Sequence, residues 1–233
     1  MASTLFAEEA IHITEGIIRE EMSKAGRKDP IYIAFDEYNV WYRARGEEGN
    51  EEKYNLEDAL VVAGYLNAFV RNAHIVKMAN LAQLVNVIAP IFTTKEGLFY
   101  QTIFFPLQLF SNYCQGVSIQ PFVDCDSYVV NHKNVPYLDV SSAYNESKNE
   151  LVLNVVNRSV DQSIVTDIIS QYGKFNGKAL IYEVNGKDIK EGNSMEKQSV
   201  KTKMSEQNVK GEKFTYPFPA HSLTVIRIPV SKN

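Results

Sequence analysis

The chain has 233 residues, of which 45% are hydrophobic, 11% aromatic and 22% charged, and its formal net charge is −4. This composition is typical of a globular protein with a real core and excludes a wholly disordered chain. The negative charge gives no reason to expect a nucleic-acid partner, and the sequence has no apolar run of the ~18 residues that a membrane span needs.

The N-terminal segment predicts a helix over residues 4–25. Apolar residues recur there at spacings of three and four, Thr4 can cap the start and Gly26 can end it. Because Glu8 and Glu9 interrupt the first residues, the segment does not resemble a signal peptide. We therefore expect a cytoplasmic location.

Residues 31–35 predict a strand buried on both faces, as in a parallel sheet. Directly after this strand come acids, an amide and aromatic rings: Asp36, Glu37, Asn39, Trp41 and Tyr42. The C-terminal ends of parallel strands are where chemistry occurs in α/β folds. These groups suit a sugar site, because a carboxylate can attack an anomeric carbon and flat rings can stack on sugar faces. The alternative is a strand end of solvated acids beside core aromatics.

The next elements predict a parallel β-α-β unit. Residues 43–53 form a charged loop, either a solvated excursion or part of a substrate subsite. A helix follows over 56–72, with Asn55 as N-cap, and then a second buried strand over 75–81. One helix between two buried strands is typical of a parallel sheet with a right-handed crossover. The second strand is followed by the amide Gln83.

A third helix is predicted over 102–113, closed by Gly116, and beyond it the pattern becomes all-β. Asn185-Gly186 is a hairpin signal, and the polar segment 186–212 predicts a long mobile loop. The alternating segments predict an antiparallel β-sandwich, with strands at 118–123, 138–144, 151–156, 163–169, 179–184 and 223–230.

The sequence predicts neither a disulfide framework nor a metal or cofactor site. Cys114 and Cys125 lack metal-ligand spacing, and the histidines show no ligand pattern. We also find no glycine loop of the kind that binds phosphate. The expected chemistry therefore rests on side chains alone.

Three strings in register resemble family 51 glycoside hydrolases, the retaining α-L-arabinofuranosidases: DEYNVWY at 36–42, YNLEDALVVAGYLN at 54–67 and LAQLVNVIAPI at 81–91. The resemblance implies an α/β plus all-β fold. Residues 1–116 would be the C-terminal part of a (β/α)8 barrel, about two βα units, and residues 117–233 an antiparallel β-sandwich domain.

The resemblance also implies roles for single residues. Glu37 matches the nucleophile, Trp41 a sugar-contacting ring, and Gln83 an amide that binds the sugar or orients the nucleophile. Asn39 completes the set as an expected substrate contact. Tyr38 stands where the family usually has tryptophan, which keeps an aromatic wall. The family needs no metal or cofactor.

A retaining glycosidase needs a second carboxyl group about 5–5.5 Å from the nucleophile. In the family this acid/base lies in an Asn-Glu pair after barrel strand four, upstream of the part that this chain matches. Asn50-Glu51 imitates the pair, but no strand precedes it. Asp36 neighbours Glu37 and in a strand would point to the opposite face, so we expect it to be structural. The acid/base is therefore expected from elsewhere.

Two barrel strands would leave a long strand edge open, since a complete barrel takes about 250 residues. We expect either a fragment or a chain that docks with an N-terminal barrel half or forms a homo-oligomer. The family's sandwich also takes a strand from the N-terminus.

The expected function is a glycosidase portion in L-arabinose and carbohydrate metabolism. It would hydrolyse terminal non-reducing α-L-arabinofuranosyl residues of oligosaccharides or polysaccharides, with Glu37 as nucleophile and no acid/base of its own. Arabinan, arabinoxylan and arabino-oligosaccharides all stay open as substrates. The alternative is a non-catalytic β-sandwich remnant that binds a partner or a carbohydrate.

Overall fold

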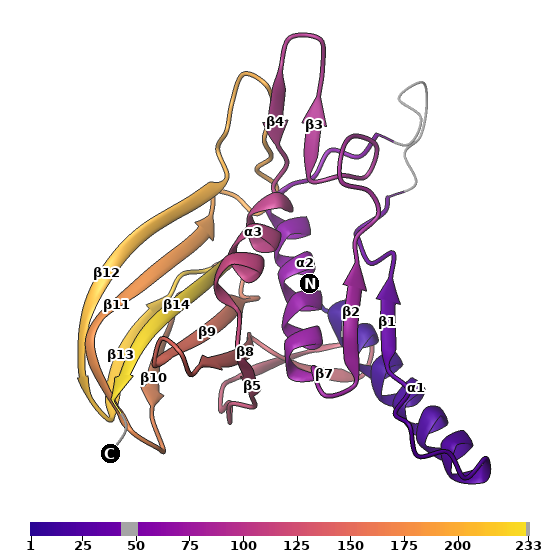
Figure 1. The fold of residues 1–233 in the computed structure, drawn as a ribbon. Coiled ribbons are helices and arrows are strands. Elements are labelled where there is room, and N and C mark those ends of the chain that lie inside the picture. The colour runs from indigo at the N-terminus through magenta and orange to yellow at the C-terminus, as the bar shows by residue number, and fades with distance from the viewer. Residues whose placement is uncertain (43–50, 232–233) are drawn as a thin grey trace.

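The computed structural model describes residues 1–42 and 51–231, and the loop residues 43–50 that the sequence places in a charged excursion lie outside this range. The structure is mostly sheet with three helices in the described residues. Helices α2 and α3 lie between a large curved sheet and the β1–β2 pair, and α1 projects beside β1 (Figure 1). The helices are α1 (Thr4–Lys24), α2 (Leu56–Arg71) and α3 (Phe104–Tyr113).

The predicted β-α-β unit is confirmed. Strand β1 (Ile33–Asp36) pairs in parallel with β2 (Val76–Asn80), and α2 connects them. The N-cap of α2 is a capping box, in which the Asn55 side chain accepts from the Asp58 backbone and the Asp58 side chain accepts from the Asn55 backbone. This start fixes the end of α2 that lies nearest the C-terminal ends of both strands.

The expectation that both strands are buried on both faces is wrong. In β1, Ile33 and Phe35 pack against the helices while Ala34 and the preceding Ile31 and Tyr32 are exposed. Four of the five residues of β2 are exposed. The physical reason is that β1 and β2 form a two-stranded sheet, and the described residues cover one of its faces.

The C-terminal part is an antiparallel six-stranded sheet in the order β12-β11-β14-β9-β8-β5. One face packs on α2 and α3, and the other packs under the two-stranded pair β10–β13. The strands of these layers are β5 (Val117–Ile119), β8 (Leu138–Asn145), β9 (Glu150–Asn157), β10 (Ile164–Ile169), β11 (Lys174–Asn185), β12 (Lys201–Gly211), β13 (Lys213–Phe218) and β14 (Ser222–Ser231).

The prediction of a mobile loop over 186–212 is wrong for residues 201–211. Strand β12 pairs with β11 along its full length, from Asn185↔Lys201 to Phe175↔Gly211. Its polar composition hid it, because β12 is an edge strand whose residues are mostly exposed, and charged residues are common there. Asn185-Gly186 is consequently no two-residue hairpin turn.

Residues 186–200 are tied to the start of α2. The carbonyls of Ile189 and Glu191 accept from the backbone N–H groups of Glu57 and Leu56, each at 2.9 Å. These two N–H groups belong to the first turn of α2, where backbone donors have no acceptor inside the helix. The loop from the sheet therefore caps the helix that supports the strand ends.

Other helix ends differ from the prediction in detail. Ser3 precedes α1 with no side-chain cap, and Thr4 Oγ1 instead donates to the carbonyl of Met1 at 3.3 Å. Helix α3 ends at Tyr113, as predicted, but its C-cap is Cys114 and not Gly116. Gly116 has φ +127°, and a Cβ there would lie 2.2 Å from the Tyr144 carbonyl oxygen, so a close chain approach requires the glycine.

Strand β13 was not predicted. Four shorter strands were not predicted either. They form two hairpins, β3 (Ile91–Thr93) with β4 (Leu98–Tyr100) and β6 (Ser127–Val130) with β7 (Lys133–Pro136). The β3–β4 hairpin stands at the end of the molecule toward which β1 and β2 point (Figure 1). No helix in the described residues combines the length and apolarity needed to cross a membrane.

Candidate functional site

The site begins where β1 ends. Glu37 follows the last residue of β1, is exposed, and has φ +57°, a backbone conformation that non-glycine residues rarely adopt. Its N–H donates to the carbonyl of Asn80, the last residue of β2, at 2.9 Å. The chain therefore turns out of the sheet at Glu37 while its backbone is still fastened to the neighbouring strand.

Asp36 has a structural partner, as expected. Asn80 Nδ2 donates to Asp36 Oδ1 at 2.5 Å, across a register pair of β1 and β2. The carboxylate of Asp36 thus orders the strand end. Glu37, one residue later, is the carboxylate left at the open edge.

Gln83 lies past the end of β2, is exposed, and is joined to Ala82 by a cis peptide bond. Because parallel strands end at the same edge of a sheet, Glu37 and Gln83 share that edge. The two predicted site residues thus come from the two segments that follow the paired strands.

The aromatic residues after Glu37 divide between core and surface. Tyr38 is buried against Tyr65 and Phe69, with ring centroids 6.0 and 4.9 Å apart, and burial raises its pKa to about 12. Tyr38 is therefore a core residue, and the expected role as an aromatic wall of the site is wrong. Trp41 is 58% exposed and presents its ring at the surface.

Asn39 uses both ends of its side-chain amide within the chain. Nδ2 donates to the carbonyl of Ile88 at 2.6 Å, and Oδ1 accepts from the N–H of Val40 at 2.8 Å. These contacts join the segment after β1 to the segment after β2. A substrate would meet at most the second amide hydrogen of Asn39 and the second lone pair of its Oδ1.

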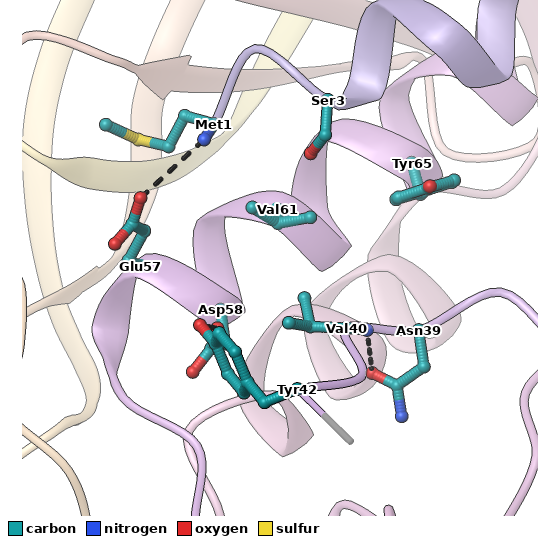
Figure 2. A pocket seen from close by; sticks show the side chains of 9 residues that line it. All are labelled: Met1, Ser3, Asn39, Val40, Tyr42, Glu57, Asp58, Val61 and Tyr65. Carbon is teal, nitrogen blue, oxygen red and sulfur yellow. Dashed lines mark hydrogen bonds and ion pairs between the residues drawn. The ribbon is translucent and has the colours of Figure 1, made fainter. Parts of the chain in front are cut away.

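A pocket of about 280 Å³ lies beside these segments, against the first turns of α2 (Figure 2). The Tyr42 hydroxyl donates there to Asp58, whose pKa is raised by burial although this hydrogen bond opposes the shift. Glu37, Trp41 and Gln83 do not line it. Its lining residues are Met1, Ser3, Asn39, Val40, Tyr42, Glu57, Asp58, Val61 and Tyr65.

The other carboxylates of this region have structural partners. Glu51 Oε2 accepts from the N–H of Val87 at 2.9 Å, and Glu52 Oε1 accepts from the N–H of Tyr42 at 2.8 Å. Asn50, the other half of the Asn-Glu string, lies outside the described residues. The contact of Glu51 agrees with the expectation that this string is a coincidence.

The histidines and cysteines have no site-like arrangement in the described part of the chain. His12 contacts Asn72 and His74 contacts Glu15, each at 3.1 Å, and both cysteines are free thiols. No group of three or more His, Cys, Asp or Glu residues within 1–42 and 51–231 could hold a metal.

Sequence reasoning missed the residues that hold the two strand-end segments together. Tyr54 and Gln101 are both 2% exposed, and both make hydrogen bonds to these segments. The one available signal is the glutamine itself, a lone amide in the apolar stretch Leu98–Phe105. A polar residue at a buried position needs partners, which a sequence alone does not identify.

The comparison with protein families finds one match. The model described as "Alpha-L-arabinofuranosidase C-terminal domain" matches residues 36–222. The match begins at the last residue of β1 and extends to the first residue of β14.

Curated relatives include "Probable alpha-L-arabinofuranosidase C" of Aspergillus clavatus, 41% identical over 97% of this chain and 46% of the relative. Another is "Intracellular exo-alpha-(1->5)-L-arabinofuranosidase" of Acetivibrio thermocellus, 33% identical over 79% of this chain and 40% of the relative. The chain thus spans about half the length of the curated relatives that it matches.

Solved structures include the thermostable GH51 α-L-arabinofuranosidase of Thermotoga petrophila, with a TM-score of 0.86 and 28% identity over 97% of this chain and 49% of that one. The α-L-arabinofuranosidase of Thermotoga maritima, described as an arabinose complex, has a TM-score of 0.83 and 27% identity over 97% and 48%.

Proposed function

The chain belongs to the family 51 α-L-arabinofuranosidases, whose C-terminal domain it matches over residues 36–222, and on this basis we propose that it supplies the nucleophile of such an enzyme. The proposed reaction is hydrolysis of terminal non-reducing α-L-arabinofuranosyl residues from oligosaccharides or polysaccharides. The observation that carries the proposal is the exposed Glu37 carboxylate at the edge that β1 shares with β2.

The proposed mechanism is a retaining double displacement. Glu37 attacks the anomeric carbon while the bond to the leaving oxygen breaks, which gives a covalent arabinosyl-enzyme. A carboxylic acid outside this sequence protonates the leaving oxygen and then takes a proton from the water that releases arabinose. Glu37 leaves as a free carboxylate, and two inversions give net retention.

Trp41 and Gln83 are the proposed sugar contacts. Both are exposed, and both belong to the segments that leave the shared strand edge. An exposed indole can stack on a furanose face, and an exposed amide can donate to a sugar hydroxyl and accept from one. The sequence predicts the same role for Asn39, but its intrachain bonds support a positioning role, which we propose instead.

We propose that the β1-α2-β2 unit is the last part of a (β/α)8 barrel and that an N-terminal barrel half completes it. Residues 1–116 would belong to this barrel and residues 117–233 to the sandwich domain. The exposed second face of β1 and β2 supports the proposal, because apolar strands of a barrel are covered on both faces. Alternatively, a second copy of this chain in a homo-oligomer would cover the exposed face of β1 and β2.

A cytoplasmic location is also a proposal. Its support is the printed name of the Acetivibrio thermocellus relative, which calls that protein intracellular. The curated relatives are named arabinofuranosidases, and the proposed substrates are accordingly arabinofuranosides.

The test is reconstitution. The chain would be mixed with a separately produced polypeptide covering the first half of the Aspergillus clavatus relative, and release of nitrophenol from 4-nitrophenyl α-L-arabinofuranoside would be followed. We expect hydrolysis by the complex, and a loss of at least about 10³-fold with Glu37→Gln. Glu212→Gln, an exposed glutamate of the sheet region, is the matched control and should stay active.

A stable complex of the two halves that hydrolyses nothing would contradict the proposal. It would favour the alternative of a non-catalytic binding remnant. Equal activity of Glu37→Gln and the control would contradict the assignment of the nucleophile while leaving the glycosidase activity in place.

A further inference from the structure

Two irregular segments leave the strand edge, and each carries part of the proposed site. The β1 segment, residues 37–42 and 51–54 as described, carries Glu37 and Trp41. The β2 segment, residues 81–90, carries Gln83. Past the last register pair, Asp36↔Asn80, neither segment continues the β1–β2 ladder. Other contacts must therefore set the distance between them.

Tyr54, the last residue of the β1 segment, bonds back to its own segment and across to the β2 segment. Its buried hydroxyl lies 2.8 Å from the carbonyl oxygen of Val40 and 3.2 Å from that of Ile88. The first oxygen belongs to the outgoing part of the β1 segment and the second to the β2 segment. One hydroxyl hydrogen thus serves two carbonyls that the strand pairing does not connect.

Gln101, which lies between β4 and α3, makes a second connection between the two segments. Its Nε2 donates to the carbonyl of Glu52 at 2.9 Å and to that of Ala89 at 3.1 Å. Its Oε1 accepts from the N–H of Tyr54 at 2.9 Å. A single buried amide therefore bonds the returning part of the β1 segment and the β2 segment at once.

Backbone contacts follow the same path. The N–H of Glu52 donates to the carbonyl of Val87 at 3.0 Å, and the N–H of Gln101 donates to that of Pro90 at 2.9 Å. The side chains of Tyr54 and Gln101, by comparison, form hydrogen bonds to groups of the two segments and not to the helices α2 and α3 that follow them. An ordinary core position would be filled by an apolar residue of similar size.

We propose that Tyr54 and Gln101 are positioning residues that fix the β1 segment against the β2 segment, and so set the placement of Glu37 and Trp41 relative to Gln83. The role in catalysis rests on the proposed function. The mechanical role, in which the two side chains hold Trp41 and its segment in place, is independent of it.

The test uses Tyr54→Phe and Gln101→Met, which remove the hydrogen bonds and nearly keep the volume. Matched controls are Tyr144→Phe, whose exposed hydroxyl bonds Asn149, and Gln115→Met, whose exposed amide bonds Ser111. Circular dichroism would establish that all four variants are folded.

The first measurement is fluorescence of the chain itself, because Trp41 is its one tryptophan. We expect Tyr54→Phe and Gln101→Met to lower the steady-state anisotropy and to raise acrylamide quenching about twofold, and both controls to match the wild type. Unchanged anisotropy and quenching in both folded variants would overturn the proposal.

The second measurement is hydrolysis by the reconstituted complex. Since a displacement of about 1 Å can cost 10²-fold in rate, we expect kcat to fall about 10-fold or more in each variant, with KM changed much less. A rise in KM at constant kcat would overturn the catalytic part. If Trp41 is loosened in the variants while the wild-type complex is inactive, the mechanical role stands and the proposed function fails.

Discussion

Strands β9 and β14, the two middle strands of the six-stranded sheet, can be compared with β1 and β2, which make up the two-stranded sheet. The last six residues of β9 are all buried, as are the first five of β14. In β1 no residue is fully buried, and in β2 one is. An apolar run thus indicates that a strand packs against other elements. It does not indicate whether those elements belong to the same chain.

The same contrast extends to α1. Ala7 and Ile11 pack toward α2, while a second stripe at helical spacing is bare: Phe6 is 67%, Ile13 64% and Ile17 57% exposed. A helix with two apolar stripes is typical of an element packed between two neighbours. The α/β region therefore resembles an unfinished layer, whereas the central strands of the six-stranded sheet are covered on both faces by residues of this chain.

A buried ionic cluster joins the two regions. Asp139 of β8 accepts from Arg71 of α2 at 2.6 Å and from Arg158 at 2.8 Å, and Arg71 also binds Glu8 of α1 through two bonds. The side chains of Asp139 and Arg158 are both 4% exposed. The cluster fastens α1 and α2 to the sheet.

The largest expected effect comes from a substitution that breaks this ionic cluster. Asp139→Ala leaves the buried guanidinium of Arg158 without its carboxylate, which should lower the free energy of unfolding by about 3–5 kcal/mol. Urea denaturation measures it. Asp167→Ala removes the exposed ion pair with Lys213 and should cost less than about 1 kcal/mol. Equal losses of the free energy of unfolding in the two variants would show that the cluster does not hold the two regions together.

The second effect compares the two regions directly. Ile226→Ala, in the centre of β14, should lower the free energy of unfolding by about 3 kcal/mol. Ile17→Ala, on the bare stripe of α1, should change it by less than about 0.5 kcal/mol, because the side chain is exposed and alanine favours helix. Repeating both with the N-terminal half should raise the cost at Ile17 alone. A cost at Ile17 that the added half does not change would break the comparison.

The smallest effect is a pH dependence at the junction. Burial opposes ionisation of Glu8, but the hydrogen bonds and charge of Arg71 outweigh it and hold the pKa below its ordinary value of 4.5. The folded state therefore favours the carboxylate, so its contribution is present above about pH 4.5 and is lost as the pH falls. The free energy of unfolding of the wild type should exceed that of Glu8→Gln by about 1 kcal/mol at pH 7, and by less at pH 3. A difference constant with pH would refute this.

The sequence predicts the connectivity of the α/β region well. Residues 4–25 and 56–72 carry local helix signals, a three-four apolar spacing and a capping box, and both helices form within a residue or two of the predicted bounds. The βαβ order follows from the chain alone. Burial of the strands was mispredicted, because it depends on neighbours that a local pattern does not contain.

The β region shows the opposite fault. Strands with buried alternation were found, but the edge strand β12 was mistaken for a loop, because edge strands carry polar residues by necessity. In the candidate site, Glu37 and Gln83 could be placed at the strand ends from the sequence. The bonds from Tyr54 and Gln101 could not, since they join residues 12 to 49 positions apart.

The central claim is that Glu37 is the nucleophile. It is tested most directly by intact-protein mass spectrometry of the chain, with its complementary half, after incubation with a dinitrophenyl α-L-arabinofuranoside, whose leaving group departs without acid help. The account predicts a gain of one arabinosyl unit, located on the peptide that contains Glu37 and absent in Glu37→Ala. An adduct that persists in Glu37→Ala, or that maps to another carboxylate, would contradict it.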